Sequence, residues 1–148
     1  MKSALLIFNF LFVVFGFSFY AQDLKIRIFY NREMSKVSFS PNNANYVIWG
    51  DQGKITSTDI HGEFIIYSSG DSLNLMEKGK SLGVSSFLRF TPLKADSFAT
   101  AHYSLKPEAG TKGKHFSGNL VLTSVSGSIQ CLNEVAMETY ISGVIQAE

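Results

Sequence analysis

The sequence predicts a mainly β fold of many short antiparallel strands, followed by the start of a helical segment. Apolar and polar residues alternate with period two in short runs from residue 23 to residue 132. Gly, Pro, Asn and Asp residues interrupt these runs at regular intervals, as turns do. From residue 134 the apolar residues take the spacing of an α-helix. Because no long helix is expected earlier, the strands must pair mainly with one another.

The first 22 residues are typical of an export signal. Lys2 supplies the basic start, residues 4–15 are apolar apart from Asn9, and a small residue follows at Ala21. We expect cleavage after Ala21 or Gln22, which would place the mature protein in the periplasm, the cell envelope or the medium. The alternative is an uncleaved anchor, because the apolar stretch approaches the ~20 residues that span a bilayer.

Nine strands are expected between residues 23 and 132. In chain order they cover residues 24–30, 36–40, 46–49, 63–67, 72–76, 85–90, 98–105, 119–123 and 128–132. Residues 50–53, Gly-Asp-Gln-Gly, are expected to form the turn that closes the third strand. Residues 106–114 contain Pro107 and two glycines in a basic setting and are a candidate linker. This linker would divide the mature chain into a β-rich region, 23–105, and a C-terminal region, 106–148.

The charge balance gives no electrostatic reason to expect nucleic-acid binding. Removal of the signal takes away Lys2 and no acidic residue. The mature chain then has 12 basic and 12 acidic residues. Nucleic-acid binding calls for clustered Lys and Arg instead. Cys131 is the only cysteine, and its place in an alternating run predicts a small buried side chain rather than a reactive thiol.

The last segment, residues 133–148, is expected to be the beginning of a helix. Met137, Tyr140, Ile141, Val144 and Ile145 are spaced so that they share one apolar face. Asn133 is expected to end the preceding strand. Glu134 and Glu138 are expected to lie at the helix start, where negative charge is favourable. Gly143 costs about 1 kcal/mol relative to Ala in a helix, so a neighbouring backbone is expected to pass close to it.

These residues carry a resemblance to a known family. Residues 115–122, His-Phe-Ser-Gly-Asn-Leu-Val-Leu, are followed by Leu-Asn-Glu-Val-Ala-Met-Glu-Thr-Tyr-Ile-Ser-Gly-Val at 132–144 and by Glu148. The pattern resembles the stage II sporulation protein D family, also called the SpoIID/LytB or amidase-enhancer family. The match is specific over residues 114–148 and generic before them. Two positions depart from the family pattern: Ala136 replaces its usual proline and Thr139 its usual aspartate.

The resemblance implies a protein that acts on bacterial cell walls. Sporulation members of the family are lytic transglycosylases that cleave peptidoglycan glycan strands, whereas the LytB branch enhances a partner amidase. The resemblance assigns the catalytic acid to Glu148. No cofactor is expected, and the spacing of the histidines predicts no metal site. The resemblance also implies that the helix opens an α-helical or α+β catalytic core that is truncated here, so that the 148-residue chain itself is expected to be inactive. Glycosidic cleavage does require a carboxylic acid to protonate the leaving oxygen.

Other side chains have both a functional and a structural interpretation. Glu134, Glu138 and Tyr140 are expected to be structural, Tyr140 in the core. Trp49 and Tyr46 could stack on sugar rings but are expected in the core. His61, His102 and His115 share no metal-ligand spacing with one another. Lys112, Lys114 and His115 form a small basic cluster that is expected to be a solvated turn.

A rival hypothesis needs no catalysis at all. A secreted β-rich module that binds peptidoglycan or a cell-wall amidase would carry the same signal and strand pattern. It predicts retention on the wall without cleavage and no effect of the substitution Glu148→Gln. The strand count alone would also suit an adhesin-like surface domain.

Overall fold

The computed structural model describes residues 23–94, 100–107 and 112–147, with side chains described up to Gly143. The predicted signal, residues 1–22, and the predicted catalytic acid, Glu148, lie outside these residues. Within them, no helix is long and apolar enough to cross a membrane.

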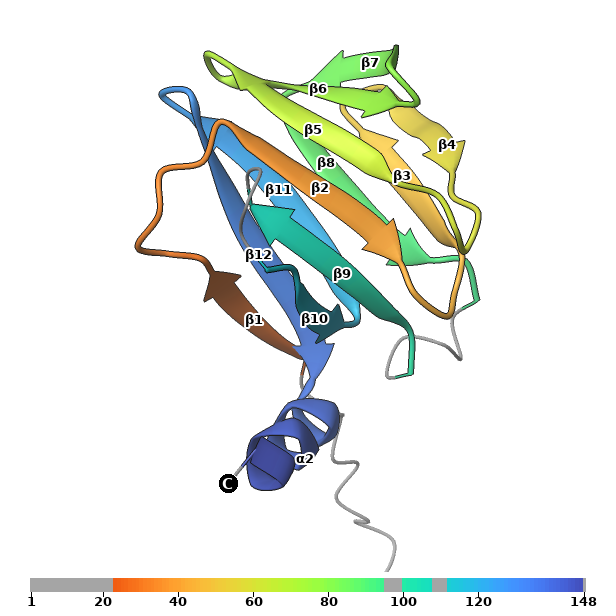
Figure 1. Ribbon diagram of the computed structural model, residues 1–148, viewed down its shortest axis with the longest axis vertical. Helices are drawn as coiled ribbons and strands as arrows, with labels where there is room; N and C mark the ends of the chain where they lie inside the picture. The colour runs from red at the N-terminus through yellow and green to blue at the C-terminus, as the bar shows by residue number, and fades with distance from the viewer. Residues whose placement is uncertain (1–22, 95–99, 108–111, 148) are drawn as a thin grey trace, which may run out of the picture.

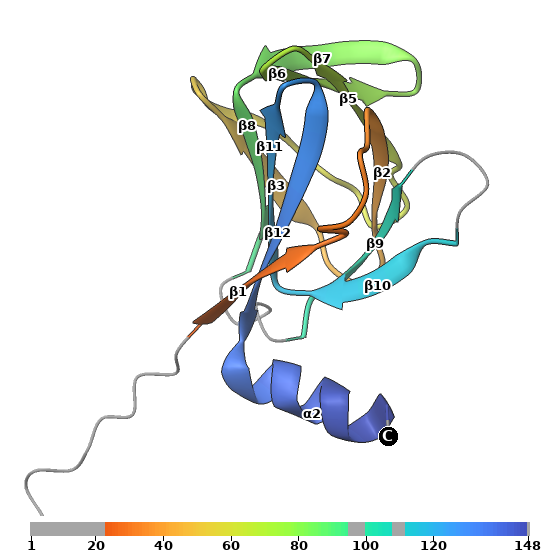
Figure 2. The same ribbon diagram turned by 90° about the vertical axis from the view of Figure 1, so that its left-hand side faces the viewer.

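The described residues form two six-stranded sheets packed face to face, with every strand pair antiparallel (Figures 1 and 2). Sheet A has the strand order β1 (Asp23–Ile28), β12 (Ser128–Ala136), β11 (Asn119–Val125), β8 (Phe87–Pro92), β3 (Tyr46–Gly50) and β4 (Gly53–Ser57). Sheet B has the order β10 (Lys114–Ser117), β9 (His102–Pro107), β2 (Lys36–Pro41), β5 (Phe64–Ser69), β6 (Ser72–Glu77) and β7 (Lys80–Ser85). The predicted class, mainly antiparallel β with a helix starting near the C-terminus, is confirmed.

Three strands were not expected from the sequence, and all three lie at sheet edges. They are β4 at one edge of sheet A, and β7 and β10 at the two edges of sheet B. An edge strand pairs on one side only and is often short and polar, so it carries little of the alternating pattern that identifies a strand. The predicted turn at residues 50–53 is the tight connection between β3 and β4.

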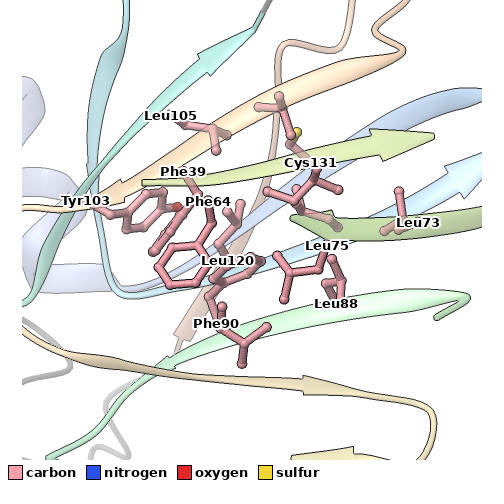
Figure 3. Packing of buried hydrophobic residues seen from close by; sticks show 14 of the residues in the cluster. Phe39, Phe64, Leu73, Leu75, Leu88, Phe90, Tyr103, Leu105, Leu120 and Cys131 are labelled. Carbon is pink, nitrogen blue, oxygen red and sulfur yellow. The ribbon is translucent and has the colours of Figure 1, made fainter. Parts of the chain in front are cut away.

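The core lies between the two sheets and is rich in aromatic side chains (Figure 3). The ring of Phe39 in β2 lies 4.3 Å from the ring centroid of Phe90 in β8 and 5.3 Å from that of Tyr103 in β9. Tyr46 in β3 meets the same Phe39 ring edge-on at 5.3 Å. Because these rings come from both sheets, they join the two sheets into one hydrophobic core.

The predicted boundary at residues 105 and 106 falls inside β9. Leu105 in β9 pairs with Lys114 in β10, so the candidate linker connects two neighbouring strands of sheet B. Downstream strands also enter sheet A, where β11 pairs with β8 and β12 pairs with β1. Residues on both sides of the predicted boundary therefore contribute to the same two sheets.

The change from strand to helix comes later than expected. Strand β12 continues to Ala136 and helix α2 spans Met137–Ala147. The expectations that Asn133 ends the strand and that Glu134 starts the helix are wrong, because Glu134 is held in a ladder with Lys25 on one side and Asn119 on the other. A strand paired on both sides keeps its extended backbone whatever the local helix signals are.

Helix α2 lies across the end of the sandwich, toward the side of β10 (Figure 2). Tyr140 and Ile141 on its predicted apolar face are 44% and 48% exposed, so the expectation that Tyr140 is a core residue is wrong. The space around Gly143 is open as well, since a Cβ placed there meets no described atom within 4 Å. The face that the sequence pattern marks as buried is accessible on the described part of the chain.

Candidate functional site at the junction of the sandwich and helix α2

The residues that carry the family resemblance meet where the chain crosses from sheet B to sheet A. Gly118 links β10 to β11 with a φ of +89°, a conformation that favours glycine. A Cβ at this position would lie only 2.2 Å from the carbonyl oxygen of Glu134. The backbone amide of Gly118 donates to the carbonyl of Ala101 at 3.1 Å. Only glycine allows the crossing to approach β12 this closely.

Asn133 fixes the same crossing from the other side. Its side chain is buried, and its amide nitrogen donates to the carbonyl oxygens of Ser117 at 2.9 Å and Asn119 at 3.1 Å. The hydroxyl of Tyr103 lies 2.7 Å from the same nitrogen. Asn133 therefore provides hydrogen bonds to backbone groups on both sides of Gly118, which a buried turn requires.

Glu134 is a buried carboxylate on the outer face of sheet A. It is 6% exposed, and its Oε2 accepts a hydrogen bond from Arg89 Nη2 at 2.5 Å and one from Asn119 Nδ2 at 3.3 Å. Lys25 Nζ lies 3.7 Å from Oε1. Sequence reasoning missed this cluster. The available signal was the alternation of residues 128–136, which places Glu134 on the same side as Leu132 if the strand continues.

A hollow of about 390 Å³ lies beside this crossing, at the first turns of helix α2. It is lined by His102, Ser117, Glu138, Thr139, Ser142 and Gly143. The imidazole Nδ1 of His102 is 2.7 Å from the hydroxyl oxygen of Ser117. That contact engages one ring nitrogen, and none of the described residues hydrogen-bonds to the other, Nε2. The hollow thus combines an imidazole, a hydroxyl and the carboxylate of Glu138, a set able to bind hydroxyl groups and to exchange protons.

A second histidine lies on the same face of the β9–β10 hairpin. His115 Nδ1 is 2.9 Å from the hydroxyl of Ser104 and 3.0 Å from the amide nitrogen of Asn42. Since Ser104 pairs with His115 and His102 pairs with Ser117, the two histidines are diagonal neighbours. Their spacing in the sequence gave no sign of this. His61 lies outside this pair, in the connection between β4 and β5.

The other predicted residues fall in three environments. Tyr46 and Cys131 are core residues as expected, and burial raises the pKa of the Cys131 thiol to about 12. Trp49, expected in the core, is 40% exposed on the outer face of sheet A. Lys114 is the first residue of strand β10, and its Nζ lies 5.8 Å from the ring centroid of Phe29. The expected solvated turn is therefore wrong for Lys114.

No family model, curated protein or solved structure matches this chain. The functional conclusion consequently rests on the residues and their geometry.

Proposed function

We propose that this protein is an exported cell-wall enzyme of the SpoIID/LytB type, a lytic transglycosylase that cleaves peptidoglycan glycan strands with Glu148 as its acid. The single observation that carries the proposal is the set of contacts made by Gly118, Asn133 and Glu134 where the chain passes from β10 to β11 beside β12. These are residues of the resemblance, and each has a contact that depends on its chemical type. Because Gly118 lies far from Asn133 and Glu134 in the sequence but meets them in one corner of the fold, we treat the motif as one structural unit.

The strand that carries Asn133 and Glu134, β12, sets the direction in which helix α2 leaves the sandwich. The helix begins one residue after β12 ends, and β12 is fixed by pairing with β1 and β11. Glu148 follows the helix directly in the sequence and is spaced four residues from Val144 and three from Ile145. A carboxylic acid near apolar side chains keeps its proton to higher pH, which suits a general acid at neutral pH.

The chemistry needs a single carboxyl group. As the acid, it donates its proton to the O4 leaving oxygen while the glycosidic C1–O4 bond breaks. As the resulting carboxylate, it accepts the proton of the muramyl 6-hydroxyl, whose oxygen bonds to C1 and closes the 1,6-anhydro ring. No water is consumed, so the second carboxylate of ordinary glycosidases is not required. The hollow beside His102 and Glu138 supplies polar groups suited to sugar hydroxyls.

The decisive experiment compares the protein as its gene encodes it with the variant Glu148→Gln on glycan strands stripped of peptides. Wild type should release products with anhydromuramyl ends, identified by mass spectrometry, and the variant should lose at least about 100-fold in rate. Retention on the glycan should persist, since the substitution removes an acid and keeps the size of the side chain. Glu63→Gln, at an exposed position beside β5, is the matched control and should leave the rate unchanged. Release by Glu148→Gln at the wild-type rate would contradict the assignment.

A non-catalytic wall-binding module is the second candidate. It is favoured by the sandwich of two six-stranded sheets, whose core cluster is formed, among the residues with described side chains, by the strands and their connections. This function predicts retention on peptidoglycan with no anhydro product from either protein. The amidase-enhancer role is separated by adding a cell-wall amidase: faster release of peptides in the presence of this protein would support it. The proposed partners are thus glycan strands and, in the last case, an amidase.

A further inference from the structure

The outer face of sheet A carries one side chain from each of its six strands in a continuous row. Strand register aligns these residues in the order Arg27, Leu132, Val121, Arg89, Trp49 and Lys54. We call this set the outer row. With neighbouring strands ~4.8 Å apart, its backbone positions span ~24 Å.

The side chains of the outer row point away from the core. Their strand neighbours Ile48, Phe90 and Leu122 are completely buried on the inner face. By contrast Trp49 is 40% exposed, the side chain of Arg89 is 43% exposed, and Arg27 and Lys54 are exposed. Helix α2 lies across the end of the sandwich toward the opposite side, so it leaves this face open (Figure 2).

The outer row combines cations with a free aromatic ring. Arg27, Arg89 and Lys54 provide three positive charges, and Leu132 and Val121 form an aliphatic floor between two of them. The cation–π contacts of the described residues, Lys36 with Tyr67 and Lys114 with Phe29, do not involve Trp49.

Two nearby carboxylates, those of Glu134 and Asp51, have partners within the protein. Glu134 is buried against Arg89 and so holds that guanidinium in place. Asp51, in the adjoining turn, accepts hydrogen bonds from the backbone amide and the hydroxyl of Ser86, both at 2.6 Å. The cations and the indole are thus accessible on this face, together with the exposed carboxylate of Asp23 at the start of β1.

We infer that the outer row is a binding surface for a glycan strand that carries carboxylate groups. The indole of Trp49 stacks on a sugar ring, because the C–H bonds of the ring face are weakly positive and the π-face is negative. Arg89 beside it, and Arg27 and Lys54 at the ends, pair with carboxylates along the strand. The surface is separate from the hollow beside α2, and the choice of a glycan among polyanions rests on the proposed function.

Trp49 is the only tryptophan of the chain, so its fluorescence reports on this face alone. The protein is titrated with soluble peptidoglycan strands stripped of peptides, whose muramyl groups carry carboxylates. The same strands with their carboxyl groups chemically reduced are the matched ligand. The expected result is a saturable change in Trp49 emission with the carboxylated strands and a much weaker one with the reduced strands. Added salt should weaken binding, because it screens exposed charges.

Two variants test the cations without disturbing the fold. Arg27→Gln and Lys54→Gln alter exposed side chains, and each should weaken binding about two- to fivefold. Lys80→Gln, in the exposed β7 of sheet B, removes the same charge elsewhere and should bind as wild type. Arg89 is left intact because its loss would leave the buried carboxylate of Glu134 without this cation.

Three outcomes would overturn the inference. They are equal binding of reduced and carboxylated strands, unchanged binding by Arg27→Gln and Lys54→Gln together, and an unchanged Trp49 emission at saturation. A stronger response to phosphatidylglycerol vesicles than to glycan, lost in the same double variant, would assign the row to an anionic lipid surface instead. The proposed function is tested independently, since Glu148→Gln should abolish cleavage and leave the Trp49 titration unchanged.

Discussion

Gly118 shows how one residue can determine a crossing between two sheets. Its positive φ and its contact with the Glu134 carbonyl both require the absence of a side chain, while Asn133 satisfies the carbonyls on either side of it. The three residues are separated by up to sixteen positions in the sequence but form one buried corner. At this scale, the contacts of these three residues explain their chemical types on structural grounds alone, independently of the proposed function.

Replacing Gly118 by alanine should therefore be far more costly than the same change at another glycine of similar backbone. Gly118→Ala should lower the free energy of unfolding by more than about 3 kcal/mol, since strain and a backbone clash add. Gly127 has a φ of +83° but open space around it, so Gly127→Ala isolates the strain, about 1–2 kcal/mol. Urea denaturation of both variants checks this. Equal losses would mean that the crossing can move away from β12.

Three buried acids, Cys131, Tyr46 and Tyr103, make the protein sensitive to alkali. Burial raises the pKa of the Cys131 thiol from 9.0 to about 12 and raises the pKa of both tyrosine hydroxyls. A raised pKa in the folded state stabilises the protein fully below the pKa of the unfolded state. This contribution is lost as the pH rises through the folded value.

The free energy of unfolding should therefore fall as the pH rises above about 9, by up to ~1.4 kcal/mol per pH unit for each titrating group. Denaturation at a series of alkaline pH values measures the slope. In Cys131→Ala the decrease should begin about one unit higher, where unfolded tyrosine titrates. A wild-type stability that stays constant to about pH 11 would contradict the burial of these groups.

Strand β12 is the element that joins the described parts of the site. It pairs with β1 and β11, places Asn133 toward the core and Glu134 toward the outside, and leads directly into α2. Through Glu134 it also holds Arg89 of β8, across the intervening strand β11. One strand thus links the corner beside the hollow to the outer row on the opposite face.

The ion pair of Glu134 with Arg89 should be strongly coupled, whereas that with Lys25 should not. A double-mutant cycle with Glu134→Ala and Arg89→Ala should give a coupling energy of about 1–2 kcal/mol, reduced from a fully buried pair because Arg89 is 43% exposed. The cycle with Lys25→Ala should give less than about 0.5 kcal/mol, because that lysine is 67% exposed and 3.7 Å away. Similar coupling energies in the two cycles would contradict this prediction, because they would mean that Glu134 interacts equally strongly with Arg89 and with Lys25.

The whole molecule is organised around one core to which both sheets contribute. The core includes Phe39 and Leu73 from sheet B and Phe90, Leu120 and Cys131 from sheet A. Strands that come last in the chain occupy central places, since β11 lies between β12 and β8. The chain before residue 106 accordingly lacks the strands that complete both sheets.

The polypeptide 23–105 should fail to fold, because removing β10, β11 and β12 uncovers β8 and exposes the core. The polypeptide 23–136 retains all the strands that the structure describes and should fold without helix α2. Amide NMR spectra distinguish the two outcomes, with dispersed signals expected only for the longer polypeptide. Dispersed signals from residues 23–105 would instead support the domain boundary that the sequence suggested.

The sequence predicted strands best where one face is buried. Strands such as β2 and β11 alternate clearly because each side chain is either in the core or outside it. The edge strands β4, β7 and β10 were missed, since an edge position imposes this pattern less strictly, whereas β1, at the other edge of sheet A, still alternates and was expected. Trp49 and Tyr140 were assigned to the core because an apolar side chain does not itself reveal whether another layer covers it.

The sequence by itself determined the antiparallel β class, the central strands, the burial of Cys131 and the onset of a helix near the C-terminal end. These properties follow from local periodicity, which neighbouring residues carry. Only the tertiary structure decided that β12 continues through Glu134, that Gly118 lies against it, and that His102 and Glu138 line the same hollow. Those relations depend on strand pairing between residues far apart in the chain, and periodicity contains no information about which strands become neighbours.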